Sequence, residues 1–171
     1  MAGLVLASNG DLYGTTTDGG ADYGTVFEVT PSGTFTTVYN VCPQGGCQDA
    51  GAPYGGLVQD TNGEFYGTTP YGGFRKICKG GCGTVFSLSV GLGPFVETQT
   101  TSGKVGSAVK ILGTGLTGAS SVTFNGTAAV FTVSPSGAAI STTVPAGATS
   151  GPVQVVTPNG TLSSNVPFRV L

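Results

Sequence analysis

The chain contains no histidine and no tryptophan, and only 8% of its 171 residues are charged. Without histidine, neither a Ser-His-Asp triad nor a Cys-His pair can be assembled. No apolar run reaches the roughly 20 residues that a membrane-spanning helix needs. No basic cluster of the kind that binds nucleic acid is present either. These absences argue against triad hydrolases, helical membrane proteins and nucleic-acid-binding proteins.

Acidic residues are missing from the C-terminal part of the chain. All eight lie at or before Glu97. The residues before Thr98 hold three bases and eight acids, a net charge of −5, whereas 98–171 hold three bases and no acid, a net charge of +3. A shift this sharp predicts two domains, 1–98 and 99–171, with weak attraction between them or between neighbouring copies.

Glycine is abundant, with 31 residues, and an internal repeat dominates the first half. The segment 3–16 recurs as 56–69 at an offset of 53 residues. The run Gly24-Thr25-Val26-Phe27 recurs as 83–86 at an offset of 59, so the second copy carries a six-residue insertion. We therefore predict that each of the two copies, 3–52 and 56–98, folds as a four-stranded meander like a propeller blade.

The strands expected in the first copy are 4–8, 11–16, 25–30 and 34–41, with Asn9-Gly10 as a type I′ hairpin turn. The second copy is expected to run through 84–90 to a last strand near 95–98. Two blades cannot close a ring. Either they are the end of a longer propeller, or their outer faces are covered by each other and by the C-terminal domain, or neighbouring chains cover them.

Residues 99–171 are predicted to form a small β-sandwich, because short strands with alternating apolar residues are separated by glycine-rich turns. The expected strands are 105–112, 121–124, 128–133, 139–144, 151–157 and 164–170. The sequons at Asn125 and Asn159 both read better as hairpin turns than as glycosylation sites. The whole chain is thus expected to be all-β, with two four-stranded propeller-blade-like repeats and a C-terminal sandwich.

Two resemblances support this organisation. The repeat core, Asn-Gly-(Asp/Glu)-(Leu/Phe)-Tyr-Gly-Thr-Thr followed by Gly-Gly and Gly-Thr-Val-Phe, resembles the GloVer tandem repeat over 3–97. That repeat occurs in large exported bacterial proteins with varied surface anchors. A second pattern is carried by Pro94 and by the runs 102–106, 109–113, 122–126, 144–148 and 151–155. Through these residues, 93–171 resembles an IPT/TIG immunoglobulin-like domain.

The resemblances imply an extracellular or cell-surface setting and an Ig-like sandwich, and they imply no catalytic residues. The chain opens at Met1 directly onto a strand-like run. An exported protein of this sequence would therefore be a mature or excised form.

The four cysteines form two close pairs. We expect local disulfides, Cys42–Cys47 between the repeats and Cys78–Cys82 in the insertion, each worth on the order of 2 kcal/mol. A cross-repeat pairing and a Cys₄ zinc site are the alternatives. The segment 60–64 spaces its oxygen-bearing side chains as calcium loops do, but hairpin chemistry explains it. We expect no metal and no cofactor.

The loop aromatic residues are the candidates for ligand contact: Tyr23, Tyr54, Tyr71 and Phe74. Tyr13 and Tyr66 occupy equivalent strand positions and are expected to pack in the core or between the two blades. The best prediction is a non-catalytic extracellular structural protein that acts in self-assembly, including fibre formation, or in adhesion. Its partner would be other copies of itself or a surface polymer. The alternative is a glycan-binding module. A remote alternative is a piece of a surface hydrolase that uses Asp18 with Asp22, or Asp60 with Glu64.

Overall fold

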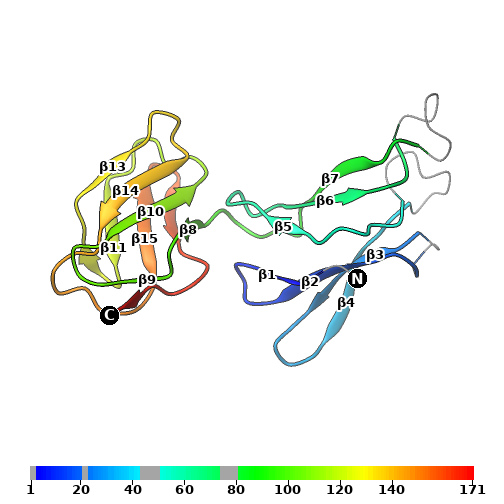
Figure 1. Ribbon diagram of the computed structural model, residues 1–171, viewed down its shortest axis with the longest axis horizontal. Coiled ribbons are helices and arrows are strands. Elements are labelled where there is room, and N and C mark those ends of the chain that lie inside the picture. The colour runs from blue at the N-terminus through cyan, green and yellow to red at the C-terminus, as the bar shows by residue number, and fades with distance from the viewer. Residues whose placement is uncertain (1–2, 21–22, 43–50, 74–80) are drawn as a thin grey trace. The chain divides into compact units, whose positions relative to one another are not determined.

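The computed structural model describes residues 3–20, 23–42, 51–73 and 81–171. These residues form strands and turns and contain no helix, so the fold is all-β as expected. Contacts divide the chain into two compact units (Figure 1). The repeat unit comprises 1–60 and 64–92, and the sandwich unit comprises 61–63 and 93–171.

The repeat unit contains two antiparallel sheets. The first is a meander of β1 (Val5–Leu6), β2 (Leu12–Thr16), β3 (Thr25–Val29) and β4 (Phe35–Asn40). The second contains β5 (Val58–Gln59), β6 (Phe65–Thr69) and β7 (Thr84–Leu88).

The fourth strand expected for the second copy is wrong. The segment near 95–98 forms β8 (Val96–Thr98), which pairs with β10 (Ala108–Gly113) of the sandwich. Val96 is fully buried there in the sandwich core, and that burial accounts for the assignment.

The turn type expected at Asn9-Gly10 is also wrong. A type I′ turn needs a positive φ at both central residues, and only Gly10 has one, at 89°. Ala7 donates its N–H to the Asp11 carbonyl over 2.9 Å, which makes a three-residue loop ending in a left-handed glycine. The Asn9 side chain favours this loop, because its Oδ1 accepts the Asp11 N–H at 3.1 Å. The hairpin itself is present as expected.

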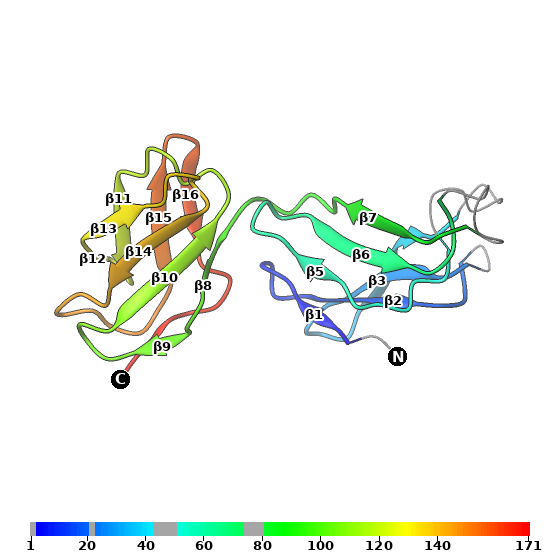
Figure 2. The ribbon, with the colours of Figure 1, turned by 45° about the horizontal axis from the view of Figure 1, so that its top comes forward.

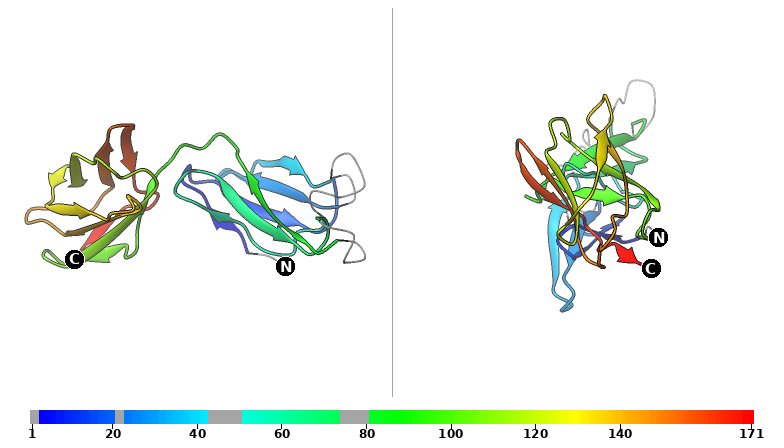
Figure 3. Two further views of the ribbon diagram at one scale, coloured as in Figure 1. Left: turned by 90° about the horizontal axis from the view of Figure 1, so that it is seen from above. Right: turned by 90° about the vertical axis from the view of Figure 1, so that its left-hand side faces the viewer.

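The two sheets of the repeat unit pack face to face. Their shared core consists of Ala7, Tyr13, Val26, Leu57 and Phe65. The rings of Tyr13 and Phe65 lie 4.5 Å apart between centroids. A polar link joins the same two sheets, since the Ser8 N–H donates to the side-chain oxygen of Gln59 over 2.8 Å. Figure 2 shows β5 and β6 lying over β1 and β2, and the left view of Figure 3 looks onto this stack.

The sandwich unit has the two-sheet architecture expected from the tail. Besides β8, its strands are β9 (Ser102–Gly103), β10 (Ala108–Gly113), β11 (Ser121–Phe124), β12 (Thr127–Ala128), β13 (Phe131–Val133), β14 (Ala139–Thr143), β15 (Val153–Thr157), β16 (Gly160–Ser163) and β17 (Arg169–Val170). One sheet has the order β13-β14-β10-β8 and the other β12-β11-β15-β16, while β9 pairs in parallel with β17.

The sandwich core lies between its two sheets. Phe124 and Phe168 meet edge to face, with ring centroids 5.2 Å apart. The two-residue hairpin expected at Asn125-Gly126 is present, and both residues have a positive φ, as a type I′ turn requires. The Asn125 amide donates to Thr149 Oγ1, in the loop before β15, at 2.8 Å.

Candidate functional site

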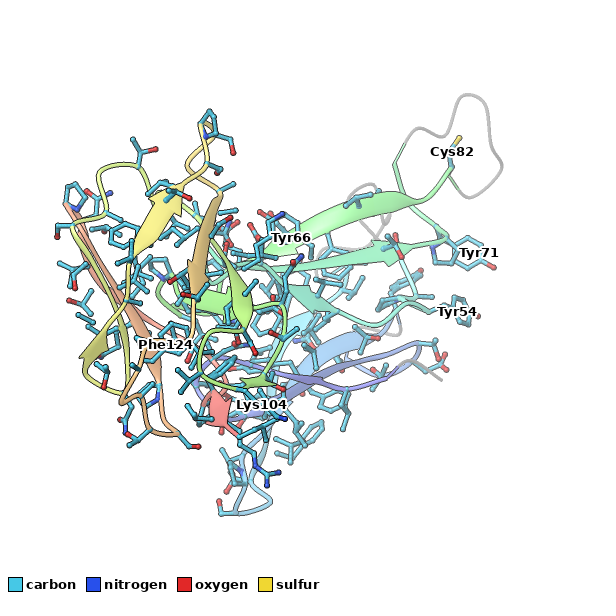
Figure 4. All side chains as sticks on the ribbon, turned by 60° about the vertical axis from the view of Figure 1, so that its left-hand side comes forward. Tyr54, Tyr66, Tyr71, Cys82, Lys104 and Phe124 are labelled. Carbon is cyan, nitrogen blue, oxygen red and sulfur yellow. The ribbon has the colours of Figure 1, made fainter. Side chains whose placement is uncertain are left out.

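Three loops bring the candidate tyrosines to one end of the repeat unit. Tyr23 precedes β3, Tyr54 lies between β4 and β5, and Tyr71 follows β6. The segment from Gly51 to Tyr54 contacts both the loop of Tyr23 and the loop of Tyr71. Ala52 donates its N–H to the Tyr23 carbonyl over 2.9 Å, and Gly51 forms an antiparallel bridge with Tyr71. All three tyrosine side chains are exposed. Figure 4 shows Tyr54 and Tyr71 projecting outward at the same end.

Threonine hydroxyls hold these loops in the same way in both copies. Thr16 Oγ1 donates to the Asp18 carbonyl at 2.8 Å, and its equivalent, Thr69, donates to the Tyr71 carbonyl at 2.7 Å. Thr16 also meets the hydroxyl of Thr25, on the neighbouring strand, at 2.8 Å. The loop that carries Tyr71 is therefore fixed by strand residues, and its tyrosine ring remains available to solvent.

An open cavity of about 510 Å³ lies beside Tyr54. Its lining comes from the end of β2 with the loop that follows, from β3 and from the segment before β5: Thr15, Thr16, Thr17, Asp18, Phe27, Pro53 and Tyr54. Hydroxyl groups, one carboxylate and two aromatic rings therefore converge on one hollow. Such a set can hydrogen-bond and stack on a polyhydroxylated ligand.

The second feature of the repeat unit is a pair of apolar faces on each sheet, since side chains alternate along a strand. We call one of them the front face. On the first sheet it carries Leu4, Leu12 and Phe27, and on the second sheet their equivalents Leu57, Phe65 and Phe86.

We call the other the back face. On the first sheet it carries Val5, Tyr13 and Val26, and on the second sheet their equivalents Val58, Tyr66 and Val85. In the stack, the back face of the first sheet packs on the front face of the second.

The other two faces are open to solvent. On the back face, Val26 is 0% exposed in the first copy, whereas its equivalent Val85 is 76% exposed in the second. On the front face, Leu57 is 7% exposed in the second copy, whereas its equivalent Leu4 is 54% exposed in the first. The repeat unit therefore presents one open front face and one open back face.

The sandwich unit has two four-stranded sheets around a core that contains Phe124 and Phe168. Residues 94–170 match the model of the IPT/TIG domain. No curated protein matches the chain. A solved crystal structure, described as domains CD of a larger protein, is 28% identical over 46% of this chain, with a TM-score of 0.41. The chain covers 33% of that structure.

The IPT/TIG domain occupies the sandwich, and the repeats lie outside the match. The GloVer resemblance therefore stays a prediction. Val130, which directly precedes β13 in the IPT/TIG domain, is 90% exposed. Among the described residues, no helix is long and apolar enough to cross a membrane.

The cysteines lie beyond the strand ends of the repeats. Cys42, directly after Val41, is buried, has a φ of 59° and is disulfide-bonded, as is Cys82 before β7. Cys47 and Cys78 lie outside the described residues, as does the candidate Phe74. The pairing Cys42–Cys47 and Cys78–Cys82 therefore stays a prediction, which a non-reducing peptide map checks.

Sequence reasoning missed an acidic pair on the edge of the repeat unit. The Tyr13 hydroxyl donates to Glu28 Oε1 at 2.6 Å, and the same carboxylate lies beside Asp11. Partial desolvation and the Glu28 carboxylate raise the pKa of Asp11 above its usual value. The register of β2 and β3 could have revealed this pair, because Glu28 is the direct cross-strand partner of Tyr13, which lies two residues after Asp11.

The expected acid pairs for hydrolysis have other places. Asp60 and Glu64 close the β5–β6 hairpin, where the Asp60 N–H donates to the Glu64 carbonyl at 2.9 Å. Asp18 lines the cavity, and Asp22 lies outside the described residues. Within the described ranges, no group of three or more His, Cys, Asp or Glu residues is placed to hold a metal ion.

The buried Tyr13 gives a pH-dependent stability. Burial, followed by the hydrogen bond to Glu28, raises the pKa of Tyr13 to about 12, from an ordinary value of 10.0. The folded state therefore holds this proton more tightly than the unfolded state. Its stabilising contribution is complete below pH 10 and is lost as pH rises from about 10 to about 12. Urea unfolding across this window should show the loss in the parent.

The control for that measurement is Tyr13→Phe, which keeps the ring against Phe65 but has no proton to lose. Its free energy of unfolding should fall less steeply over the same window. Equal slopes for the two proteins would show that Tyr13 does not titrate as described.

Proposed function

We propose that this protein is a non-catalytic structural component of an extracellular surface, and that it works by associating through its blade-like repeats. The open faces of the repeat unit carry this proposal, with Val85 and Leu4 more than half exposed at positions that are buried in the other copy. Contiguous apolar surface of this kind usually marks an association site. The IPT/TIG domain supports the setting, because such Ig-like modules are common in surface and adhesion proteins.

Size-exclusion chromatography with light scattering tests this proposal directly. The mass of the purified chain should rise above that of the monomer as its concentration increases. A mass that stays at the monomer value over the whole accessible range would refute self-association.

A second candidate function is binding of a glycan at the tyrosine end of the repeats. It is favoured by the convergence of Tyr23, Tyr54 and Tyr71 on one end, next to the open cavity that Tyr54 lines. Exposed tyrosine rings bury a large area at a small entropic cost, and their hydroxyls bond to polar ligands.

A glycan array followed by titration of the strongest hit tests this candidate. Tyr54→Ala should weaken binding by about tenfold, the equivalent of 1.4 kcal/mol. Val130→Ala is the control, because Val130 is 90% exposed in the sandwich unit and does not line the cavity. An empty array, or equal affinity of Tyr54→Ala and the parent, would exclude a glycan site here.

A further inference from the structure

The two open faces of the repeat unit differ in kind, and each has its complement within the same molecule. The single interface between the repeats joins a back face, with Tyr13 and Val26, to a front face, with Leu57 and Phe65. What remains open is one front face, on the first sheet, and one back face, on the second. A chain with these two open faces can bind further copies through the same kind of contact that already joins its two repeats.

Two residue differences between the copies favour cover for the open faces. The buried front face carries Gln59, whereas the open front face carries Leu6 at the equivalent position. The buried back face carries Glu28, whereas the open back face carries Ser87. At both positions the open face has the less polar residue, and faces that remained in water would favour the opposite pattern. Beyond the end of β5 the order is reversed, because the exposed Asp60 stands where the first copy has the buried Ala7.

We infer that a second copy of this chain covers these faces, with its open front face packed on the open back face of the first copy. The inference rests on the proposed function and adds to it the partner and the polarity of the contact. In the new interface, Val58, Tyr66 and Val85 of one copy take the places that Val5, Tyr13 and Val26 have in the existing stack. Leu4 and Leu12 of the next copy take the places of Leu57 and Phe65.

A contact of this kind is heterologous, because it joins two different surfaces. Heterologous contacts propagate, giving closed rings where the rotation closes and open fibres where it does not. The association is therefore directional. One copy always retains a free front face, and another retains a free back face, unless a ring forms.

Two variants that each block one face test the polarity. Leu4→Glu places a charge on the open front face, and Val85→Glu places one on the open back face. Both side chains are more than half exposed in the single chain, so the fold should survive, which circular dichroism checks. Val130→Glu is the matched control, because it makes the same change at a 90% exposed valine of the IPT/TIG domain.

Light scattering should give a monomer for each single-face variant alone. An equimolar mixture of the two should give a dimer of about twice the monomer mass and nothing larger, because each partner retains the face that the other lacks. The parent and Val130→Glu should form larger assemblies at the same concentration.

The two proposals fail in different ways. A monomeric parent would refute the proposed self-association, and the inference with it. A parent that associates while either blocked variant still associates alone, or while the mixture stays monomeric, would overturn the front-to-back contact and leave the proposed function standing.

Discussion

Replacing Phe65 with alanine should lower the free energy of unfolding of the repeat unit by about 3–5 kcal/mol. Phe65 is fully buried between the two sheets, and its ring lies 4.5 Å from that of Tyr13. The substitution removes the largest apolar side chain of the shared core and leaves a cavity beside Tyr13. Small domains are stable by about 5–15 kcal/mol, so the loss is a large part of the total.

Leu12→Ala is the control, because Leu12 occupies the same repeat position on the open front face. It is only partly buried, and its truncation should cost about 1 kcal/mol. Urea unfolding of both variants, at concentrations where the parent is monomeric, gives the comparison. Similar losses for Phe65→Ala and Leu12→Ala would show that stacking of the two sheets does not distinguish these positions.

The repeat made most of the strands predictable, yet it could not show which equivalent residues are buried. Val26 and Val85 lie in the same motif with the same neighbours in sequence. The first is buried because another sheet covers it, and the second is exposed because its back face is open. Burial is thus set by tertiary packing, which a local pattern does not contain.

The strand at 96–98 shows the same limit. Its alternation of apolar and polar residues fits either a blade or a sandwich, because alternation identifies the buried side of a strand and not its partner. The strand belongs to the sandwich, because Val96 packs in the core of the IPT/TIG domain.

The candidate site was partly predictable. The loop tyrosines could be selected as exposed from the sequence, since each lies beside glycine in a segment between strands. Their gathering at one end depends on contacts that link residues far apart, such as the bridge between Gly51 and Tyr71. The cavity beside Tyr54 also needs Phe27 from β3, which sequence reasoning had placed only in a strand.

Replacing Gly24 with alanine should have the second large effect, a loss of about 2–6 kcal/mol in the free energy of unfolding. Gly24 has a φ of 93°, which a residue with a side chain adopts only at a cost of about 1–3 kcal/mol. A Cβ here would also collide with the Thr16 carbonyl oxygen and lie 3.0 Å from the Pro53 ring. Because the obstacle is backbone, relief requires moving the start of β3 away from β2, at a further cost of about 1–3 kcal/mol.

Gly10→Ala separates the two contributions. Gly10 has a similar φ, 89°, but a Cβ there meets no atom within 4 Å. Its substitution should therefore cost only the backbone contribution, about 1–3 kcal/mol. Thermal or urea unfolding of the two variants measures the difference, and equal losses would remove the steric argument.

The same experiment bears on why the repeat retains its Gly-Thr-Val-Phe motif. Gly83 is the equivalent of Gly24, has a φ of 82°, and would direct its Cβ at the Thr69 carbonyl oxygen, just as Gly24 does at Thr16. Gly83→Ala should consequently match Gly24→Ala in cost. In both copies this glycine lets one strand begin against the end of the preceding one. It thereby holds the loop that carries Tyr23 in the first copy and the loop that carries Tyr71 in the second. The motif therefore has a structural role that precedes any ligand, and the exposed tyrosines depend on it.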